Sequence, residues 1–550
     1  MGTSLSEIGE IAFREEMSRR GLAALPLVVV VLVAGVAQGG FAPAARGAGC
    51  GAASATVAAA AVRAATPVCQ LTPGGNPLAV REPGKVTRQL SEAKSVPSLL
   101  RLYDLHGAEF NEIHLATTWM ALSRLRRGKP MTHNLAEGLE PLVAQSVKMA
   151  SSGRLQARPV ANIAYGAARS GLRSPQGAAP LYAAVASAAM RQLRDMSPQA
   201  LANLAWAYAT AGHPAPELFD ALAQVAPRKL RGFTPQHLAN LAWAYATAGH
   251  AAPALFDAIA AAATTRLRDD AGEFNNQNLA NLAWAFARSG QPAPAMLGAV
   301  AAACETRLDT FRPIDFSSVA WAYAVTRHDA TPRLFAGIAR AATPQLGSFN
   351  DQALANLAFA FVSVGHPSAG ALLDAISTEA TPRLDEFSVQ NLANLASPYL
   401  AAGRREPALF EGVARYAAPR LGELQPMALA NYALASARSG GDADPVLWEA
   451  LGQTVEARVV DFPPAAVATL ATAFAEAGWP AQPVFDAIAA AAAPRLREYT
   501  PKELGQMGWA FAKASFAVPR VWSTGWGADV PGGEQQLVSS ATDTESRWSR

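Results

Sequence analysis

The sequence predicts an all-α fold, an α-solenoid of about eleven helical hairpin repeats of about 38 residues each. Two nearly identical stretches, LANLAWAYATAGHPAPELFDALA from Leu201 and LANLAWAYATAGHAAPALFDAIA from Leu238, reveal the repeat, and diverged copies run over residues 100–520. The composition agrees, with 51% apolar residues dominated by Ala, 16% charged residues and no alternating β-branched runs. Such a chain predicts helices that pack closely through small side chains.

The Asn of the LAN triplet serves as an anchor for placing the repeats in register. Successive anchors are 37 to 45 residues apart, which accommodates two short helices and two turns. The anchors are Asn162, Asn203, Asn240, Asn281, Asn356, Asn394 and Asn431, with Thr117, Ser318, Thr469 and Gln506 in weaker copies.

The first helix of a repeat is best defined in TPQHLANLAWAYATAGH. Thr234 is expected to cap its start, Pro235 to occupy its first turn and Gly249 to end it in the left-handed conformation. This helix is apolar nearly all round, so it must be covered on several sides. The same terminal glycine recurs as Gly171, Gly212, Gly290, Gly365, Gly403, Gly440 and Gly478.

The second helix is more amphipathic and is expected to form an outer layer. In PALFDAIAAAATTRL, Leu255, Phe256 and Ile259 recur at helical spacing, with Asp257 and Arg266 toward water. Stacked hairpins of this kind predict a long groove rather than one deep pocket.

The first hundred residues differ from the repeats. Residues 22–36 form an apolar run of the length typical of a secretory signal, so residues 1–40 are interpreted as a signal peptide. We hypothesise that translation starts at Met17, which would place Arg19 and Arg20 just before the apolar run. Residues 41–95 are expected to be a disordered leader, and residues 521–550 a disordered tail.

The leader is basic and rich in Ala. It begins Phe41-Ala42-Pro43 and contains Arg46 and Arg63 without an acidic residue nearby. This order resembles the bipartite plastid-targeting leader of algae with secondary plastids, which implies the plastid stroma; the mitochondrial matrix, plain secretion and a single membrane anchor are the alternatives. No membrane association is expected of the mature form.

No catalytic constellation, cofactor motif or metal site is predicted. Phosphate loops, GxSxG, CxxC and HExxH are absent, and three cysteines cannot make a disulfide framework. Consecutive repeats would separate the recurring histidines by about 10 Å, too far for shared zinc coordination. The protein is therefore expected not to be an enzyme. Those histidines occupy the position just after the residue that ends the first helix, which is a glycine for all of them except His328, and they are His213, His250, His328 and His366.

The anchor Asn is a poor helix former inside an apolar bundle. Its amide is expected either to hydrogen-bond between neighbouring repeats or to the backbone, which would set the register of the repeats, or to contact a nucleic-acid base.

A cation column lies eleven residues before most anchors. A basic residue in the last turn complements the helix dipole, and a repeated cation also suits a phosphate backbone, so both interpretations stay open. The candidate phosphate-binding residues are Lys229, Arg266, Arg307, Arg383, Arg420, Arg458 and Arg495.

Two polar columns occupy the first turn of the first helix, four and three residues before the anchor. Polar residues that vary between repeats are what base reading requires, although such positions also vary without a function. The candidate base-contacting residues are Gln199, Gln236, His237, Gln277, Asn278, Gln352, Gln390 and Asn391.

The repeat core F-x-P-Q-x-L-A-N-L-A-W-A-Y-A-x-x-G-H resembles the octotricopeptide repeat of algal organelle proteins. It is also similar to repeats of FAST-kinase-like leucine-rich RNA-binding proteins and of the kinetoplastid RNA-editing substrate-binding complex subunit. The resemblance implies a non-catalytic solenoid that binds organellar mRNA or rRNA, with other RNA-processing proteins as partners, and acts in processing, stability or translation. Many such proteins end in a RAP domain, which is not seen after residue 520.

The competing hypothesis is a protein-binding scaffold of the armadillo or tetratricopeptide type. The net charge of +3 does not decide between them, because a typical nucleic-acid binder is more basic.

Overall fold

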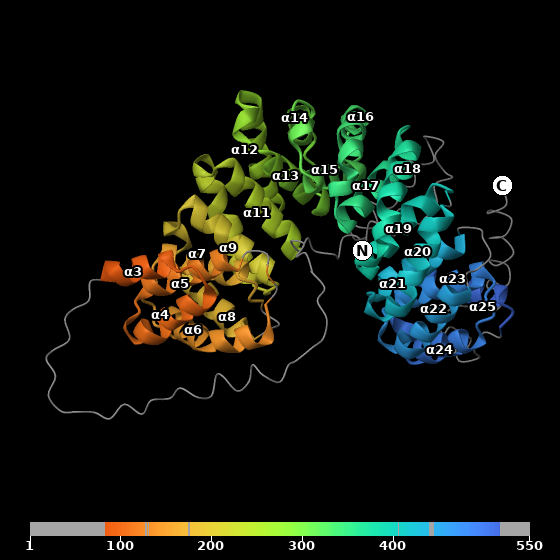
Figure 1. Cartoon of the computed structure of the whole chain (residues 1–550), viewed down its shortest axis with the longest axis horizontal. Helices are drawn as coiled ribbons and strands as arrows, with labels where there is room; N and C mark the ends of the chain where they lie inside the picture. The colour runs from red at the N-terminus through yellow and green to blue at the C-terminus, as the bar shows by residue number, and fades with distance from the viewer. Residues whose placement is uncertain are drawn as a thin grey trace, which may run out of the picture. The chain divides into compact units, whose positions relative to one another are not determined.

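The computed structural model describes residues 83–126, 129, 131–173, 177–404, 406–438 and 445–516 (Figure 1). All regular structure in these ranges is helical, which confirms the all-α repeat fold. The described residues fall into two compact units: the N-terminal unit, which ends at Arg266, and the C-terminal unit, which begins at Leu267. The expected signal peptide, most of the leader and the tail lie outside the described residues.

The first helices of the repeats pack side by side within each unit. They are α5 (Glu112–Leu125), α7 (Ala157–Arg169), α9 (Pro198–Ala211) and α11 (Pro235–Ala248) in the N-terminal unit, and α13 (Asn276–Arg288), α15 (Pro313–Thr326), α17 (Asp351–Ser363), α19 (Val389–Ala401), α21 (Pro426–Arg438), α23 (Pro464–Ala477) and α25 (Pro501–Lys513) in the C-terminal unit.

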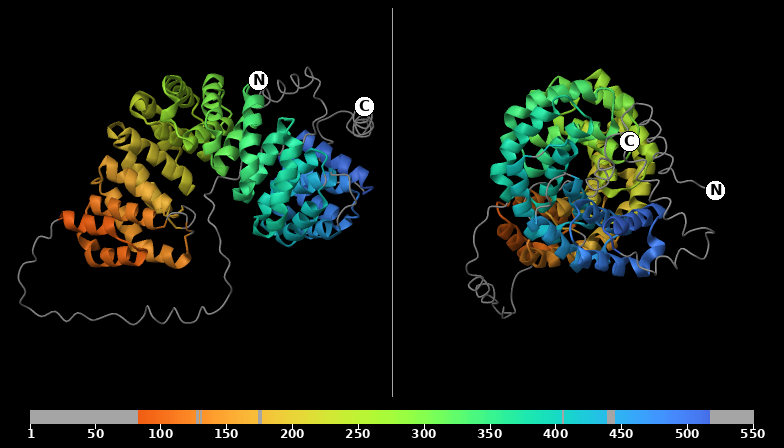
Figure 2. Two further views of the ribbon diagram at one scale, coloured as in Figure 1. Left: turned by 45° about the horizontal axis from the view of Figure 1, so that its top comes forward. Right: turned by 90° about the vertical axis from the view of Figure 1, so that its right-hand side faces the viewer.

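The second helices form a separate layer, seen for α14, α16 and α18 in Figure 1 and from two further directions in Figure 2. They are α6 (His133–Ser151), α8 (Ala179–Met190), α10 (Pro216–Val225), α12 (Pro253–Asp269), α14 (Pro294–Glu305), α16 (Thr331–Ala342), α18 (Ala369–Ala380), α20 (Pro407–Ala417), α22 (Pro445–Arg458) and α24 (Gln482–Ala492).

Short 3₁₀ helices precede most of the first helices. They are η1 (Gly107–Glu109), η3 (Leu193–Asp195), η4 (Ala226–Gly232), η5 (Ala271–Glu273), η6 (Leu308–Thr310), η7 (Thr343–Ser348), η8 (Thr381–Glu386), η9 (Ala418–Glu423), η10 (Val459–Asp461) and η11 (Ala493–Glu498).

The repeat fold begins earlier than the sequence analysis predicted. The helix α3 (Pro83–Glu92) lies inside the range interpreted as a disordered leader, and α4 (Val96–His106) begins at its end. Val86 and Leu90 of α3 are buried, and α3 packs against α5. The prediction missed α3 because its sequence, PGKVTRQLSE, lacks the LAN signature by which the repeats were recognised. The range expected to be a disordered leader therefore overlaps a helix at Pro83–Glu92.

The predicted helix ends are confirmed where the structure describes them. Thr234 caps α11 with a reciprocal bond to His237, Pro235 follows it, and Gly249 ends the helix at φ 65°. The terminal glycines of six further repeats also have positive φ, whereas Gly440 lies outside the described residues. The glycines end first helices of 13 or 14 residues.

Tyrosine hydroxyls on four first helices form hydrogen bonds to the second helix of the preceding repeat. In each case the phenol donates to a carbonyl oxygen 26 residues earlier. The pairs are Tyr208 with Tyr182, Tyr245 with Phe219, Tyr323 with Leu297 and Tyr399 with Leu373, at 2.5 to 2.6 Å. Burial raises the pKa of each of these phenols, so they stay protonated and donate.

Replacing Tyr245 by Phe is expected to lower the free energy of unfolding by about 1 kcal/mol, because the buried carbonyl of Phe219 loses its donor. The ring stays, as in Phe286 of α13, so no cavity forms. Denaturant unfolding monitored by circular dichroism measures the change. Tyr416→Phe on the second helix α20 is the control, because the Tyr416 hydroxyl has no hydrogen bond to a described residue, and equal stability losses would contradict the assignment.

Among the described residues, no helix combines the length and apolar character needed to cross a bilayer.

Candidate nucleic-acid interface

In the N-terminal unit, each first helix leaves one narrow face in contact with solvent. Exposed or partly exposed side chains lie four residues before the anchor, at the anchor, and three and seven residues after it. At 100° per residue these four positions fall within about 60° of one another, so they form one line along the helix. We call this face the stripe. In α9 the stripe is Gln199, Asn203, Trp206 and Thr210. In α15 and α17 of the C-terminal unit, the positions at the anchor and three residues after it are buried.

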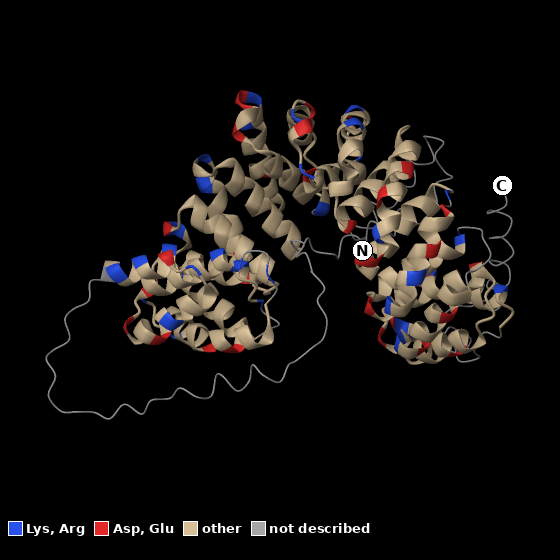
Figure 3. Cartoon of the chain, in the orientation of Figure 1, with Lys and Arg blue, Asp and Glu red and all other residues tan. Residues whose placement is uncertain are grey.

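The stripe is almost free of acidic residues, although the whole chain has 46 basic and 43 acidic residues. Its one acid, Glu476, pairs with Arg438 of the neighbouring first helix at 2.6 Å. Figure 3 shows the ribbons of α9 and α11 without a charged residue of either sign. The basic residues of the stripe are Arg124, Arg158, Arg169, Arg288, Arg438, Lys502 and Lys513.

The anchor amides do not link neighbouring repeats, as one interpretation of the sequence expected. Asn394 accepts a bond from Gln390 on its own helix at 3.1 Å. The side chains of Asn203 and Asn240 form no hydrogen bond to any described residue, and both are partly exposed. An amide with both donor and acceptor open is suited to hydrogen bonds with a ligand.

The position four before the anchor lies at the start of the stripe. Gln199, Gln236 and Gln277 are exposed there, and Gln352 and Gln390 are partly exposed. The structure therefore brings these five predicted base-contacting residues onto the same face as the anchors. Base contact by them stays a prediction.

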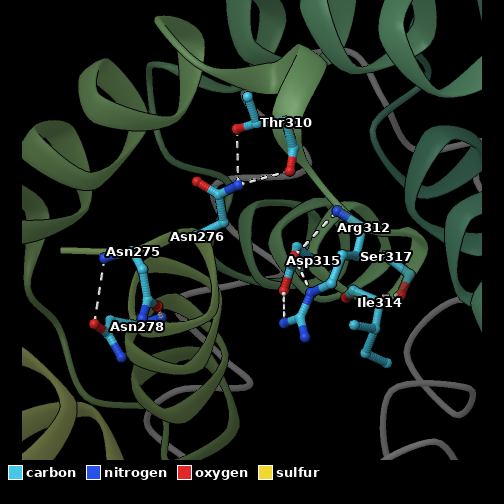
Figure 4. Close-up of polar contacts among 8 residues, drawn as sticks. All are labelled: Asn275, Asn276, Asn278, Thr310, Arg312, Ile314, Asp315 and Ser317. Atoms are coloured by element: carbon cyan, nitrogen blue, oxygen red, sulfur yellow. Dashed lines mark hydrogen bonds and ion pairs between the residues drawn. The ribbon is translucent and has the colours of Figure 1, made fainter. Parts of the chain in front are cut away.

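Polar side chains at the position three before the anchor form hydrogen bonds within the fold. This position is the third residue of the helix, where its side chain accepts from the backbone N–H of the capping residue. Asn278 accepts from the N–H of Asn275 at 3.3 Å, and Asp315 from that of Arg312 at 3.1 Å (Figure 4). Asn278 is only 5% exposed.

The two other candidates at this position are also held by the fold. The ring of His237 accepts from the N–H of Thr234 at 3.2 Å, and Asn391 donates to Asp351 at 2.7 Å. The fold thus already uses hydrogen-bonding groups of Asn278, His237 and Asn391, and base contact by these three residues stays a prediction. Capping gives Asn278, His237 and Asp315 a role that the sequence pattern alone does not distinguish from base reading.

The cation column lies between repeats. Arg307 donates to the carbonyl of Phe274 at 2.8 Å and to that of Ala271 at 2.9 Å, and Lys229 donates to those of Arg194 and Met196. The acceptors lie 33 to 37 residues earlier, in or just after the 3₁₀ helix of the preceding repeat. Arg266, Arg383, Arg420, Arg458 and Arg495 make equivalent bonds.

These contacts give the cation column a packing role that the sequence analysis did not consider. Charged donors satisfy carbonyls at the end of a 3₁₀ helix, which have no partner within that helix. Phosphate binding by the column stays a prediction. Each of its side chains already donates to a carbonyl oxygen of the preceding repeat. The basic residues of the stripe are separate from this column.

Replacing Arg307, Arg420 and Arg458 together by Met is expected to destabilise the C-terminal unit by about 1 kcal/mol for each residue, because carbonyl partners are lost. If the column has only this packing role, RNA affinity and its salt dependence will not change. Denaturant unfolding and a salt titration of RNA binding measure the two effects. A shallower salt slope at unchanged stability would instead assign the column to phosphate.

The recurring histidines contact the preceding repeat rather than one another. His250 bonds Asp220 at 2.8 Å, and His328 bonds the carbonyl of Pro294 at 2.9 Å. No group of potential metal ligands occurs among the described residues. His213 stacks on Tyr182 with ring centroids 5.6 Å apart, and burial lowers the pKa of its imidazole.

The lowered pKa of His213 makes the stability of the N-terminal unit depend on pH. The native state binds fewer protons than the unfolded state, whose imidazole has a pKa of about 6.5. The free energy of unfolding is therefore expected to be highest above that value and to fall as the pH is lowered through it. His213→Gln should make the fall shallower, because it removes the titrating imidazole. Gln is chosen because Gln291 occupies the same position in the α13 repeat. Unfolding midpoints between pH 7.5 and 5 check this, and an unchanged slope would contradict it.

The sequence analysis did not identify one column of the stripe as a candidate binding surface. The position three after the anchor holds large aromatic side chains in many repeats, and we call it the aromatic column. Helical-wheel arithmetic from the glutamines would have placed it on the same face, but Trp in an apolar helix suggests the core. Its aromatic members are Tyr165, Trp206, Trp243, Trp284, Trp321, Phe359 and Trp509.

The fold and the stripe define a helical-repeat protein with one nearly acid-free face on its first helices. Residues 141–519 match the family model described as RNA-editing substrate-binding complex 6 protein. The chain belongs to this family. No curated protein matches the sequence.

A solved structure described as a homology model of the full-length AP-3 complex in an intermediate open conformation is also similar. It is 10% identical, with a TM-score of 0.23, and the match covers 79% of this chain and 83% of that one. A likeness of this size carries no argument about fold or function.

Proposed function

We propose that the protein is a non-catalytic RNA-binding repeat protein that holds RNA along the stripe of its first helices. Its role would be in organellar RNA processing, stability or translation, with mRNA or rRNA as ligand and other RNA-processing proteins as partners. The family match over most of the repeats supports RNA as the ligand, since the family is described by binding of RNA-editing substrates. The octotricopeptide resemblance agrees.

The observation that carries the proposal is the chemistry of the stripe. Open anchor amides can bond the edges of unpaired bases, and the arginines nearby can neutralise phosphates. The near absence of carboxylates removes the repulsion that a polyanion would otherwise meet. The net charge of the chain hides this feature because the acids lie elsewhere.

The location is a second part of the proposal. The order of apolar run, Phe41 and basic Ala-rich stretch supports the plastid stroma, with the mitochondrial matrix as the alternative. Import of a fusion carrying residues 17–80 tests it, and retention of the fusion in the secretory pathway would contradict it.

A salt titration of RNA binding tests the function. The logarithm of the affinity is expected to fall linearly with the logarithm of the salt concentration. Replacing Arg158, Arg169 and Arg288 by Gln should make the slope shallower by about 2, at about 0.7 for each lost contact to a single strand. Replacing the exposed Arg194, Arg228 and Arg340 by Gln removes the same charge outside the stripe and is the control.

Two outcomes would contradict the proposal. Equal slopes for both triple variants would mean that the stripe does not bind phosphate. Absence of binding to any RNA pool, with capture of protein partners along the stripe, would favour the scaffold hypothesis instead.

A further inference from the structure

The aromatic column of the N-terminal unit forms a continuous surface of rings. Tyr165, Trp206 and Trp243 come from the successive first helices α7, α9 and α11. The ring centroids of Tyr165 and Trp206 are 5.0 Å apart at 45°, and those of Trp206 and Trp243 are 6.4 Å apart at 30°. All three side chains are partly exposed.

The same column is different in the C-terminal unit. Trp284 and Trp321 also stand next to each other, with centroids 6.3 Å apart, but they are only 6% and 3% exposed. In later repeats the column holds Ser397 and Thr472. An accessible run of rings on consecutive helices is thus a feature of the N-terminal unit among the described residues.

The packing of the first helices does not require these rings. Ser397 and Thr472 occupy the same position in repeats whose first helices pack side by side in the same way. The aromatic residues of the core lie two positions later, as Tyr208 and Tyr245, where they are fully buried. Trp206 and Trp243 therefore place apolar ring surface at the solvent boundary beyond what the repeat fold needs.

The neighbours of the rings have the chemistry of a single-stranded nucleic-acid site. Each ring lies three residues after an anchor amide that is partly exposed, and Arg158 and Arg169 lie on the same stripe. The guanidinium of Arg169 lies 5.5 Å from the centroid of Tyr165 and donates to its hydroxyl at 2.5 Å. Stacking surface, open amides and cations together suit bases that are not paired.

We propose that Tyr165, Trp206 and Trp243 form a stacking platform for the bases of single-stranded RNA. This inference rests on the proposed function and narrows it to unpaired RNA bound by the N-terminal unit. Duplex RNA is excluded from the platform because its bases are stacked inside the helix and its grooves present backbone and base edges. A protein partner would be expected to bury the rings without regard to nucleic-acid structure.

The test compares binding of the full chain to three labelled RNAs: a single-stranded 20-mer, the same strand annealed to its complement, and the 20-mer with abasic sites in its centre. Trp206→Leu with Trp243→Leu is expected to weaken single-strand binding by about tenfold for each ring, because base stacking is lost. The salt slope should stay unchanged, since no charge changes. The variant should bind the abasic strand as tightly as the unmodified chain does.

Two further variants keep the test decisive. Trp206→Phe with Trp243→Phe retains a ring at each site and is expected to restore most of the affinity, which a loss of folding would not do. Trp509→Leu removes a partly exposed ring from the same column on α25 and should leave affinity nearly unchanged. Thermal unfolding of each variant accompanies the binding measurements.

The outcomes separate the inference from the function on which it rests. If the chain binds single-stranded RNA and the double Leu variant binds it equally well, the platform is wrong and RNA binding stands. The same conclusion follows if duplex competes as well as single strand, or if Phe does not restore binding that Leu has lost. If the unmodified chain binds none of the three RNAs, both the platform and the proposed function are wrong.

Discussion

Replacing Gly166 by Ala is expected to destabilise the N-terminal unit by about 2–3 kcal/mol, because the added methyl group has no space between α5 and α7. A Cβ at this position would lie 2.6 Å from the backbone carbon of Trp119 and 2.7 Å from its carbonyl oxygen. Backbone atoms cannot rotate away as a side chain can, so the two helices must separate. Trp119 is fully buried and donates to Ser146 at 3.0 Å, so a shift of α5 disturbs more than one contact.

This prediction opposes the one that the repeat sequence suggests. The equivalent position holds Ala207, Ala244 and Ala285 in the following repeats, and Ala has a helix propensity about 1 kcal/mol better than Gly. A repeat consensus would therefore predict that Gly166→Ala stabilises the protein. Gly138→Ala on α6 is the control, because nothing lies within 4 Å of its added Cβ and a small gain is expected. Denaturant unfolding distinguishes the cases, and a gain at Gly166 would contradict the close approach.

Replacing Asn203 and Asn240 together by Asp is expected to weaken single-stranded RNA binding by about 100-fold. Each change places a carboxylate on a stripe that holds almost none, and it replaces an amide donor with an acceptor only. Repulsion and the lost donor at about 1–1.5 kcal/mol for each site account for the factor. Folding should be little affected, since neither side chain bonds a described residue.

The matched control changes the net charge by the same two units outside the stripe. Gln224→Glu with Arg228→Gln alters exposed side chains on α10 and η4. Because distant exposed charges are screened beyond about 10 Å at 0.1 M salt, a loss of no more than a few-fold is expected. Binding isotherms at fixed salt measure both variants. Equal losses would mean that overall charge, rather than the stripe, determines affinity.

The architecture could be predicted from sequence because its signals are local. Thr234, Pro235 and Gly249 define the ends of α11 by their own backbone preferences, and all three have the predicted roles. The short helix α3 was missed since it lacks the repeat signature, although Val86 and Leu90 are buried by contacts with α5. The need for glycine at position 166 could not be predicted either, because it arises from the close approach of the Trp119 backbone on the neighbouring helix α5.

The candidate site was predicted in part, since sequence gives position along the chain but not the partner of a side chain. Gln199 and Gln236 lie on the stripe and are exposed, so their position agrees with the predicted contact to a ligand. Asn278 has the same polar character one residue later, yet it turns back to its own helix cap. Arg307 recurs as a phosphate ligand would, and its carbonyl partners 33 and 36 residues earlier became visible only in the structure.

Photocrosslinking locates bound RNA on the protein directly. The full chain is bound to single-stranded RNA that carries 4-thiouridine, irradiated and digested, and the crosslinked peptides are identified by mass spectrometry. Crosslinks are expected on the stripe of α7, α9 and α11, at or beside Tyr165, Trp206 and Trp243. Crosslinks confined to the second helices or to the 3₁₀ connectors, under conditions in which the RNA is bound, would contradict RNA binding along the stripe.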